Sequence, residues 1–133
     1  MTEEKALALY ARCYNRCDFS ELNRKLSQKA TYMAYNNFYE HKGRGSVCKA
    51  LDAKAADLRA LPRPNKVWRG YLKGRAEALD LPRMDSCLVL TADDPSRVLG
   101  VVILTRALFR IRDIRVLDPA RCQYTRGSRL ECR

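Results

Sequence analysis

Two segments of the chain carry apolar residues at the spacing of an α-helix. Between residues 3 and 16 these residues recur three and four positions apart, which predicts an amphipathic helix. A second helix of this kind is expected at about 46–61, because Pro62 and Pro64 then stop the pattern. A shorter helix is expected between the two, at about 19–27.

Elsewhere the apolar residues alternate with polar ones, as they do in β-strands. Residues 30–40 are rich in β-branched and aromatic side chains and are expected to form the first strand. After Pro64 four further strands are expected, at about 66–79, 86–92, 97–106 and 108–117.

The longest of these strands, 66–79, has one polar and one apolar alternate set. The apolar set contains Trp68 and Leu72, and the polar set contains Arg69. We expect the Trp68 set to face the core and Arg69 to face solvent. The glycines in the apolar set, at positions 70 and 74, would let the strand bend.

The order of these elements indicates a single α+β domain in residues 1–118. Helices come first and a meander of strands follows, so three N-terminal helices are expected to pack on one side of a curved sheet. Residues 119–133 form a basic C-terminal segment whose structure the pattern does not predict.

The net charge of +11 is compatible with several partners. Nucleic acid, an acidic protein or ligand, and simple solubility all suit such a charge. The chain has six cysteines and one histidine, His41, but no Cys-x-x-Cys pair, so neither a metal nor another cofactor is expected. The acidic start of the sequence predicts no secretory signal, and the apolar runs are too short for us to expect a membrane span. We therefore expect a soluble, cytoplasmic protein with no membrane partner.

The segment from Tyr10 to Val47 resembles bacterial ketosteroid isomerases and, through them, the nuclear transport factor two-like superfamily. That superfamily also includes polyketide cyclases, scytalone dehydratase and limonene epoxide hydrolase. Some of its small members are encoded by mobile gene cassettes, and this chain resembles those proteins. The matching residues are Tyr10, Asn15-x-x-Asp18-Phe19, Leu22-x-x-x-Leu26, Ala30-Thr31-Tyr32, Gly43 and Val47.

The resemblance implies a cystatin-like fold. In it a mixed, mostly antiparallel sheet curls into a cone whose mouth takes a small, mainly apolar molecule. It also implies a homodimer formed through the convex face of the sheet.

The resemblance argues against steroid isomerisation in its usual form. That chemistry needs an aspartate base, a tyrosine and a protonated aspartic acid. The tyrosine position falls on Tyr10, but the base position falls on Ala34, which cannot move a proton. The strand expected to carry the second acid, 97–106, has no carboxyl group.

Two other sets of catalytic residues known from this superfamily are poorly matched. An Asp–His pair would have to use His41, which we expect at the surface near the end of its strand. An Asp-Arg-Asp set could use Asp85, Arg69 and Asp113, but Arg69 is expected on the outer face.

Three hypotheses follow. The first is a binding pocket for a small apolar or amphipathic ligand. Its expected wall consists of Tyr10, Tyr14, Tyr32, Ala34, Asn36, Phe38, Trp68, Leu72 and Cys87.

The second hypothesis is a non-catalytic interaction module that meets an acidic protein or nucleic acid. It would use a basic sheet face made by Arg69, Lys73, Arg75, Arg110 and Arg112. The third is an enzyme in which Tyr10 and Tyr32 donate hydrogen bonds and Asp85 or Asp113 is the base.

Overall fold

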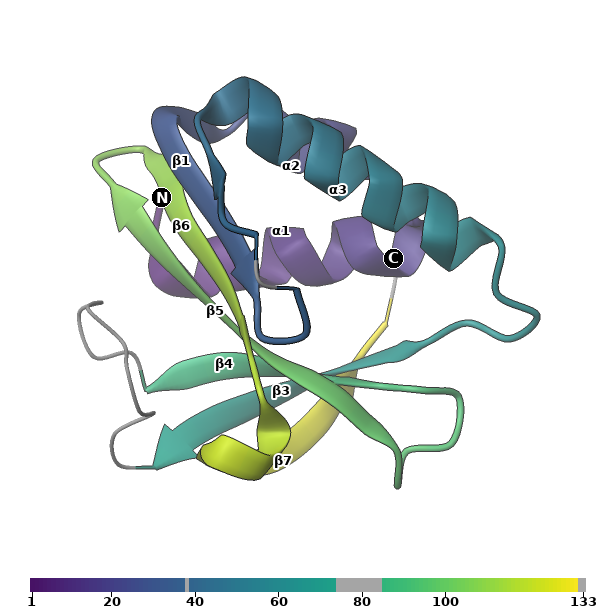
Figure 1. Cartoon of the computed structure of the whole chain (residues 1–133). Helices are drawn as coiled ribbons and strands as arrows, with labels where there is room; N and C mark the ends of the chain where they lie inside the picture. The colour runs from purple at the N-terminus through teal and green to yellow at the C-terminus, as the bar shows by residue number, and fades with distance from the viewer. Residues whose placement is uncertain (38, 74–84, 132–133) are drawn as a thin grey trace.

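A computed structural model describes residues 1–37, 39–73 and 85–131 of the chain (Figure 1). Its helices are α1 (Glu3–Arg16), α2 (Ser20–Asn23), α3 (Arg44–Arg59) and the 3₁₀ turn η1 (Pro119–Arg121). Its strands are β1 (Leu26–Ala34), β2 (His41–Lys42), β3 (Lys66–Lys73), β4 (Ser86–Thr91), β5 (Val98–Ala107), β6 (Arg110–Leu117) and β7 (Gln123–Leu130).

The ends of α1 have well-defined caps. At its start the Thr2 hydroxyl accepts a hydrogen bond from the Lys5 amide at 3.1 Å, as an N-cap residue does. At its end Cys17 adopts the left-handed conformation, and its amide donates to the Tyr14 carbonyl at 3.1 Å. These caps give α1 the bounds that the apolar pattern predicted.

The seven strands of the described residues belong to one mixed sheet with the order β2-β1-β6-β5-β4-β3-β7. Only the pair β1 and β6 is parallel among these neighbours. The helices lie over one face of the sheet (Figure 1). The sheet is curved, so that β3, β4 and β7 run below the helices at an angle to β1 and β6. This is the α+β architecture expected from the sequence.

The sheet is apolar on both faces. The face toward α1 and α3 forms the larger core, which contains Tyr10, Phe19, Leu22 and Leu51. The opposite face forms a second buried cluster of Cys87, Val89, Val101 and Ile103. The side chains of Trp68, Leu72, Leu117, Cys122 and Tyr124 pack against that cluster.

The segment after residue 118 covers part of this second face. Asp118 caps η1, and the chain then pairs with β3 as strand β7. Because β6 and β7 lie at different places in the sheet order, their connection crosses the outer side of the strands between them. Cys122, just before β7, and Tyr124, near its start, thus bury the apolar side chains that the helices do not reach.

Three expectations need correction. The helix expected at 19–27 ends at Asn23, because the chain joins the sheet at Leu26, whose partner is Ile111. The strand expected at 30–40 runs from Leu26 to Ala34 instead and then turns, as the Asn37 amide donates to the Ala34 carbonyl at 3.0 Å. For the strand expected at 66–79, residues 74–79 lie outside the described residues.

The third correction concerns the faces of β3. Trp68 and Leu72 lie on the side of β3 away from the helices. Val67 belongs to the core that faces the helices, and Arg69 lies on the same side of β3 as Val67. As expected, Arg69 is exposed and the Trp68 set packs against buried side chains. The wrong part of the prediction is the face of the sheet, because Arg69 was expected on the face away from the helices. The reason is the second buried face, which gives the apolar set of β3 a place to pack away from the helices.

Within the described residues, no helix is both long and apolar enough to cross a membrane.

Gly70 lies where β3 closely approaches both β4 and β7. A Cβ atom there would lie 2.8 Å from the Thr125 carbonyl oxygen, 2.9 Å from Val89 Cγ2 and 3.0 Å from Cys87 Sγ. The pairing of β3 with β7 also shifts register between Trp68 and Gly70. A residue without a side chain is therefore needed where β3 bends between its neighbours.

We predict that Gly70→Ala lowers the free energy of unfolding by about 1–3 kcal/mol, because backbone must move to admit the methyl group. Gly45→Ala is the control, since a methyl group on this residue of α3 would meet no neighbouring atom within 4 Å. That control should be neutral or stabilising. Urea denaturation of both variants measures the difference, and equal stabilities would contradict the close approach.

Candidate functional site

A pocket of about 700 Å³ opens between α3, the C-terminal half of α1 and the helix-facing side of β1. α1 supplies aromatic side chains, α3 supplies small and charged ones, and the sheet supplies mostly apolar ones. The lining residues are Tyr10, Tyr14, Tyr32, Ala34, Tyr35, Asn36, Asn37, His41, Lys49, Ala50, Ala53, Lys54, Asp57, Leu90, Leu99 and Val116.

Tyr10 is the most deeply buried of these residues, with 0% of its surface exposed. Its ring centroid lies 6.2 Å from that of Tyr14 and 5.4 Å from that of Phe19. Its hydroxyl has no hydrogen-bond partner among the described residues. Leaving a buried hydroxyl without a partner costs about 1–3 kcal/mol. The pocket wall therefore contains a polar group that the described part of the chain does not satisfy.

Tyr10 belongs to a cluster of three phenols. Burial raises the pKa of Tyr10 well above the usual value, and the nearby phenols of Tyr32 and Tyr14 raise it further. Burial, with a smaller effect of Tyr14, raises the pKa of Tyr32 to about 12. The hydroxyl of Tyr14, unlike that of Tyr10, has a partner, because it accepts a hydrogen bond from Asn65 Nδ2 at 2.9 Å. All three phenols thus stay protonated at neutral pH and can donate hydrogen bonds.

His41 also lines the pocket, although we expected it at the surface. Its Nδ1 lies 3.2 Å from Ser46 Oγ, and its ring meets that of Tyr39 edge-on with centroids 4.8 Å apart. The Tyr32 ring centroid lies 6.1 Å away. The short strand β2 brings this imidazole to the pocket by pairing His41 with Tyr32.

Five of the nine residues predicted to form a ligand wall line this pocket. They are Tyr10, Tyr14, Tyr32, Ala34 and Asn36. Phe38 lies outside the described residues.

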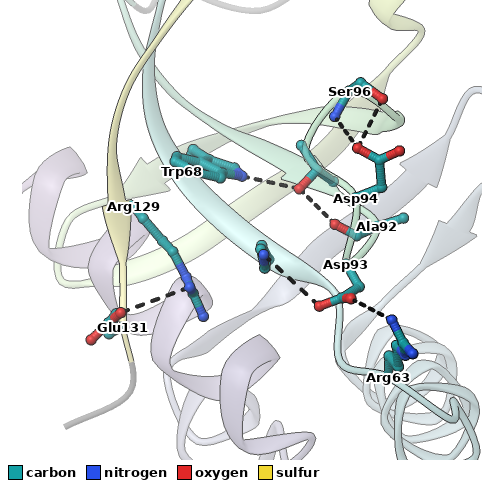
Figure 2. A network of polar contacts seen from close by, with 10 residues as sticks. Arg63, Trp68, Ala92, Asp93, Asp94, Ser96, Arg129 and Glu131 are labelled. Atoms are coloured by element: carbon teal, nitrogen blue, oxygen red, sulfur yellow. Dashed lines mark hydrogen bonds and ion pairs between the residues drawn. The ribbon is translucent and has the colours of Figure 1, made fainter.

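The structure does not bring Trp68, Leu72 and Cys87 to the pocket. They lie in the cluster on the opposite face of the sheet. There the Trp68 indole donates to Thr91 Oγ1 at 3.0 Å (Figure 2), and the Arg126 guanidinium lies 4.8 Å from its ring centroid. These contacts make Trp68 part of the packing between β3, β4 and β7.

The candidate acids of the sequence analysis also lie away from the pocket. Asp113 accepts hydrogen bonds from the hydroxyls of Thr31 and Thr105, each at 2.7 Å, on the face opposite the helices. Asp85 is exposed just before β4. Arg69 borders a small crevice with Glu4 of α1. The Asp-Arg-Asp arrangement is therefore not assembled.

Sequence reasoning missed the residues that α3 contributes. Lys49, Ala53 and Asp57 are four residues apart, and so are Ala50 and Lys54. On a helix this spacing gives a stripe of small and charged side chains beside the apolar stripe. The stripe was visible in the sequence, and it marks the side of α3 that borders open space.

Comparisons with known proteins support this architecture. No family model matches the sequence, and no curated protein matches it. Solved structures do match. A nuclear transport factor two-like protein of unknown function from Cytophaga hutchinsonii has a TM-score of 0.54 at 11% identity, covering 90% of this chain and 93% of that chain.

The chain has the nuclear transport factor two-like fold.

Two enzymes share this nuclear transport factor two-like fold with the chain. SalBIII, described as an epoxide hydrolase/cyclase-like enzyme in pyran ring formation in the polyether salinomycin, has a TM-score of 0.58 at 15% identity, covering 94% of this chain and 95% of that chain. The Δ5-3-ketosteroid isomerase from Mycobacterium sp. has a TM-score of 0.50 at 15% identity, covering 92% and 98%. Identities this low establish the fold alone.

In the described part of the chain, no three His, Cys, Asp or Glu side chains lie close enough together to hold a metal ion.

We predict that Tyr10→Phe raises the free energy of unfolding by about 1 kcal/mol in the ligand-free protein, because it removes an unsatisfied buried hydroxyl. Tyr14→Phe is the matched control and should lower it by about 1 kcal/mol, since it removes the bond from Asn65. Urea denaturation measures both. A loss of stability in Tyr10→Phe as large as that in Tyr14→Phe would show that the Tyr10 hydroxyl has a partner.

We predict a loss of stability between pH 10 and about 12 that depends on Tyr32. Its pKa is raised from 10.0 to about 12 by folding, so the native state holds the proton at pH values where the unfolded chain releases it. The stabilisation is complete below pH 10 and falls by about 3 kcal/mol as the pH rises toward the folded pKa. Urea denaturation across this pH range measures the free energy of unfolding of the wild type and of Tyr32→Phe. The two values should diverge as the pH rises, and a constant difference between them would contradict the prediction.

Proposed function

We propose that the protein binds a small amphipathic molecule in the pocket between α1, α3 and β1. The observation that carries this proposal is the Tyr10 hydroxyl, fully buried and without a partner among the described residues. A carbonyl or hydroxyl oxygen of a ligand can accept its hydrogen bond. Such a contact would turn an unfavourable feature of the free protein into binding energy.

The shape of the pocket suits a compact ligand. Ala34 of β1 and Ala50 and Ala53 of α3 are small residues on two sides of the pocket. Leu90, Leu99 and Val116 add apolar surface from the sheet. A volume of about 700 Å³ is within the range of small-molecule sites, which are mainly apolar with a few placed polar groups.

Charged residues of α3 favour a particular orientation of this ligand. Lys49 and Lys54 border the pocket on the side opposite the sheet, and Lys49 is exposed. A ligand with its oxygen at Tyr10 would direct its other end toward them. We infer a ligand with a neutral hydrogen-bond acceptor at the inner end and a polar or acidic group at the outer end.

Catalysis is a second candidate function, because His41 and Asp57 line the same pocket as the three phenols. An imidazole and a carboxylate are the side chains most used for proton transfer. Ala34 supplies no carboxyl group in this pocket, so a reaction would use His41 or Asp57 as base and Tyr10 or Tyr32 to stabilise an oxyanion. This differs from the ketosteroid isomerase arrangement.

The binding proposal is tested by a thermal-shift screen of steroids, aromatic polyketides and terpenoids, each with and without a carboxylate. We expect ligands with a ketone or hydroxyl to raise the melting temperature of the wild type. Tyr10→Phe should weaken binding of the best ligand about tenfold, the worth of one buried hydrogen bond.

Tyr71→Phe is the matched control, because Tyr71 is 49% exposed on β3 and lies outside the pocket lining. It should bind like the wild type. The proposal fails if no compound of these classes binds, or if Tyr10→Phe and the wild type bind the best ligand equally well. Turnover of a bound compound that His41→Ala abolishes without weakening binding would support the catalytic candidate.

A further inference from the structure

The turn between β5 and β6 presents two large apolar side chains to solvent. Leu108 is 82% exposed and Phe109 is 78% exposed, more than any other large apolar residue that the structure describes. Leu108 also adopts a left-handed conformation, with φ 55°, which is unfavourable for a branched side chain. Neither residue contributes to the core clusters. The fold itself therefore does not explain why this turn is apolar.

A basic groove lies directly beside this turn. Its volume is about 660 Å³, and it is bounded by the turn on one side and by residues 24–29, which include the start of β1, on the other. Arg24, Lys25, Lys29 and Arg110 line it, and its described lining contains no acidic residue.

Two hydrogen bonds hold the sides of the groove together. Arg110 Nη1 donates to the Arg24 carbonyl at 2.8 Å, and the Ile111 amide donates to the Lys25 carbonyl at 2.8 Å. The basic side chains and the apolar turn thus lie at one hydrogen-bonded end of the sheet.

We propose that this end of the sheet docks on the surface of a membrane that contains anionic lipids. Leu108 and Phe109 would enter the outer part of the hydrocarbon, and the four basic residues would contact lipid phosphates. The arrangement of these side chains matches the layers of a bilayer surface. The apolar side chains project from the turn, and the basic side chains line the groove next to it. A bilayer presents its negative charges outside and its apolar layer inside.

Other partners match this order less well. A nucleic acid supplies phosphates and base faces, and Phe109 could stack on a base, but nothing in it requires the exposed Leu108. A contact with the membrane surface needs no membrane-spanning segment, so it is compatible with the helices of the described residues.

The docking end lies away from the proposed ligand pocket. The pocket touches β5 at Leu99, whereas the turn follows Ala107, eight residues along the strand. At about 3.3 Å per residue this separation is roughly 25 Å. The pocket would stay open to the aqueous side when the turn is docked, so this inference does not depend on the proposed ligand.

Co-sedimentation with lipid vesicles tests the proposal. Full-length protein is mixed with vesicles of phosphatidylcholine alone or of phosphatidylcholine with phosphatidylglycerol, at low and at physiological salt. We expect binding to the mixed vesicles, little binding to the neutral ones, and weaker binding as salt rises.

Two double variants separate the apolar and the basic contributions. Leu108→Ser with Phe109→Ser should weaken binding to the mixed vesicles at least tenfold. Lys25→Glu with Lys29→Glu should weaken it by about fivefold or more for each residue, since one basic side chain contributes on the order of that factor at an anionic surface.

Matched controls carry the same kinds of change elsewhere. Tyr39→Ser removes a 63% exposed aromatic residue, and Lys42→Glu with Lys73→Glu reverses two exposed lysines away from the groove. Both controls should bind nearly as well as the wild type, and circular dichroism checks that every variant is folded.

Three results would overturn the proposal. One is the absence of wild-type binding to the mixed vesicles. Another is equal weakening by the control and test variants, which would indicate a general effect of charge. The last is salt-sensitive binding of single-stranded RNA that depends on Lys25 and Lys29 but not on Leu108, without vesicle binding, which would assign the groove to nucleic acid.

Discussion

The structure depends on the need to cover both faces of the central strands. In β4 and β5 the side chains are buried without alternation over most of their length, so neither face can remain in water. The helices α1 and α3 cover one face, and the connection through η1 to β7 covers the other. Gly70 permits this second cover, because β7 and β4 both approach β3 too closely there for a side chain.

The pocket follows from how the helices cover their face. α1 packs closely on the sheet through Tyr10 and Leu9, whereas α3 presents Ala50 and Ala53 where larger residues would fill the space. The result is an opening whose inner wall carries phenols and whose outer wall carries charges. The buried phenols are protonated donors, and the Tyr10 hydroxyl remains unsatisfied among the described residues. We propose a ligand oxygen as its partner.

The sequence predicted those parts of the fold that local periodicity and turn chemistry determine. The helix at 3–16 and the strands at 86–92, 97–106 and 108–117 are examples. Figure 2 shows the side chain of Asp94 bonded to Ser96 in the turn that joins the first two of these strands. Periodicity gives the alternation of a strand but not which side faces the helices. Trp68 was misplaced for this reason, because two buried faces look alike in sequence.

The residues that line the pocket were predicted in part, and their role in binding stays a prediction. The tyrosines of α1 and β1 were found because the resemblance and the alternation both pointed to them. Asp57 and Lys54 were missed because a charged residue on a helix is usually solvated, and only the packing shows which charges border a pocket. The homodimer and the nucleic-acid partner stay predictions. The basic set proposed for them also changes, since Arg69 lies on the helix side of β3 and Arg75 lies outside the described residues.

The central claim is that the Tyr10 hydroxyl is available to a ligand. Its most direct test is the ¹³C NMR signal of the ring carbon that bears the hydroxyl, in protein labelled at that carbon of tyrosine and assigned with Tyr10→Phe. On addition of the best ligand, the account predicts that the Tyr10 signal shifts more than that of Tyr14, which already has its bond from Asn65. A bound ligand that moves the Tyr14 signal and leaves that of Tyr10 unchanged would contradict it.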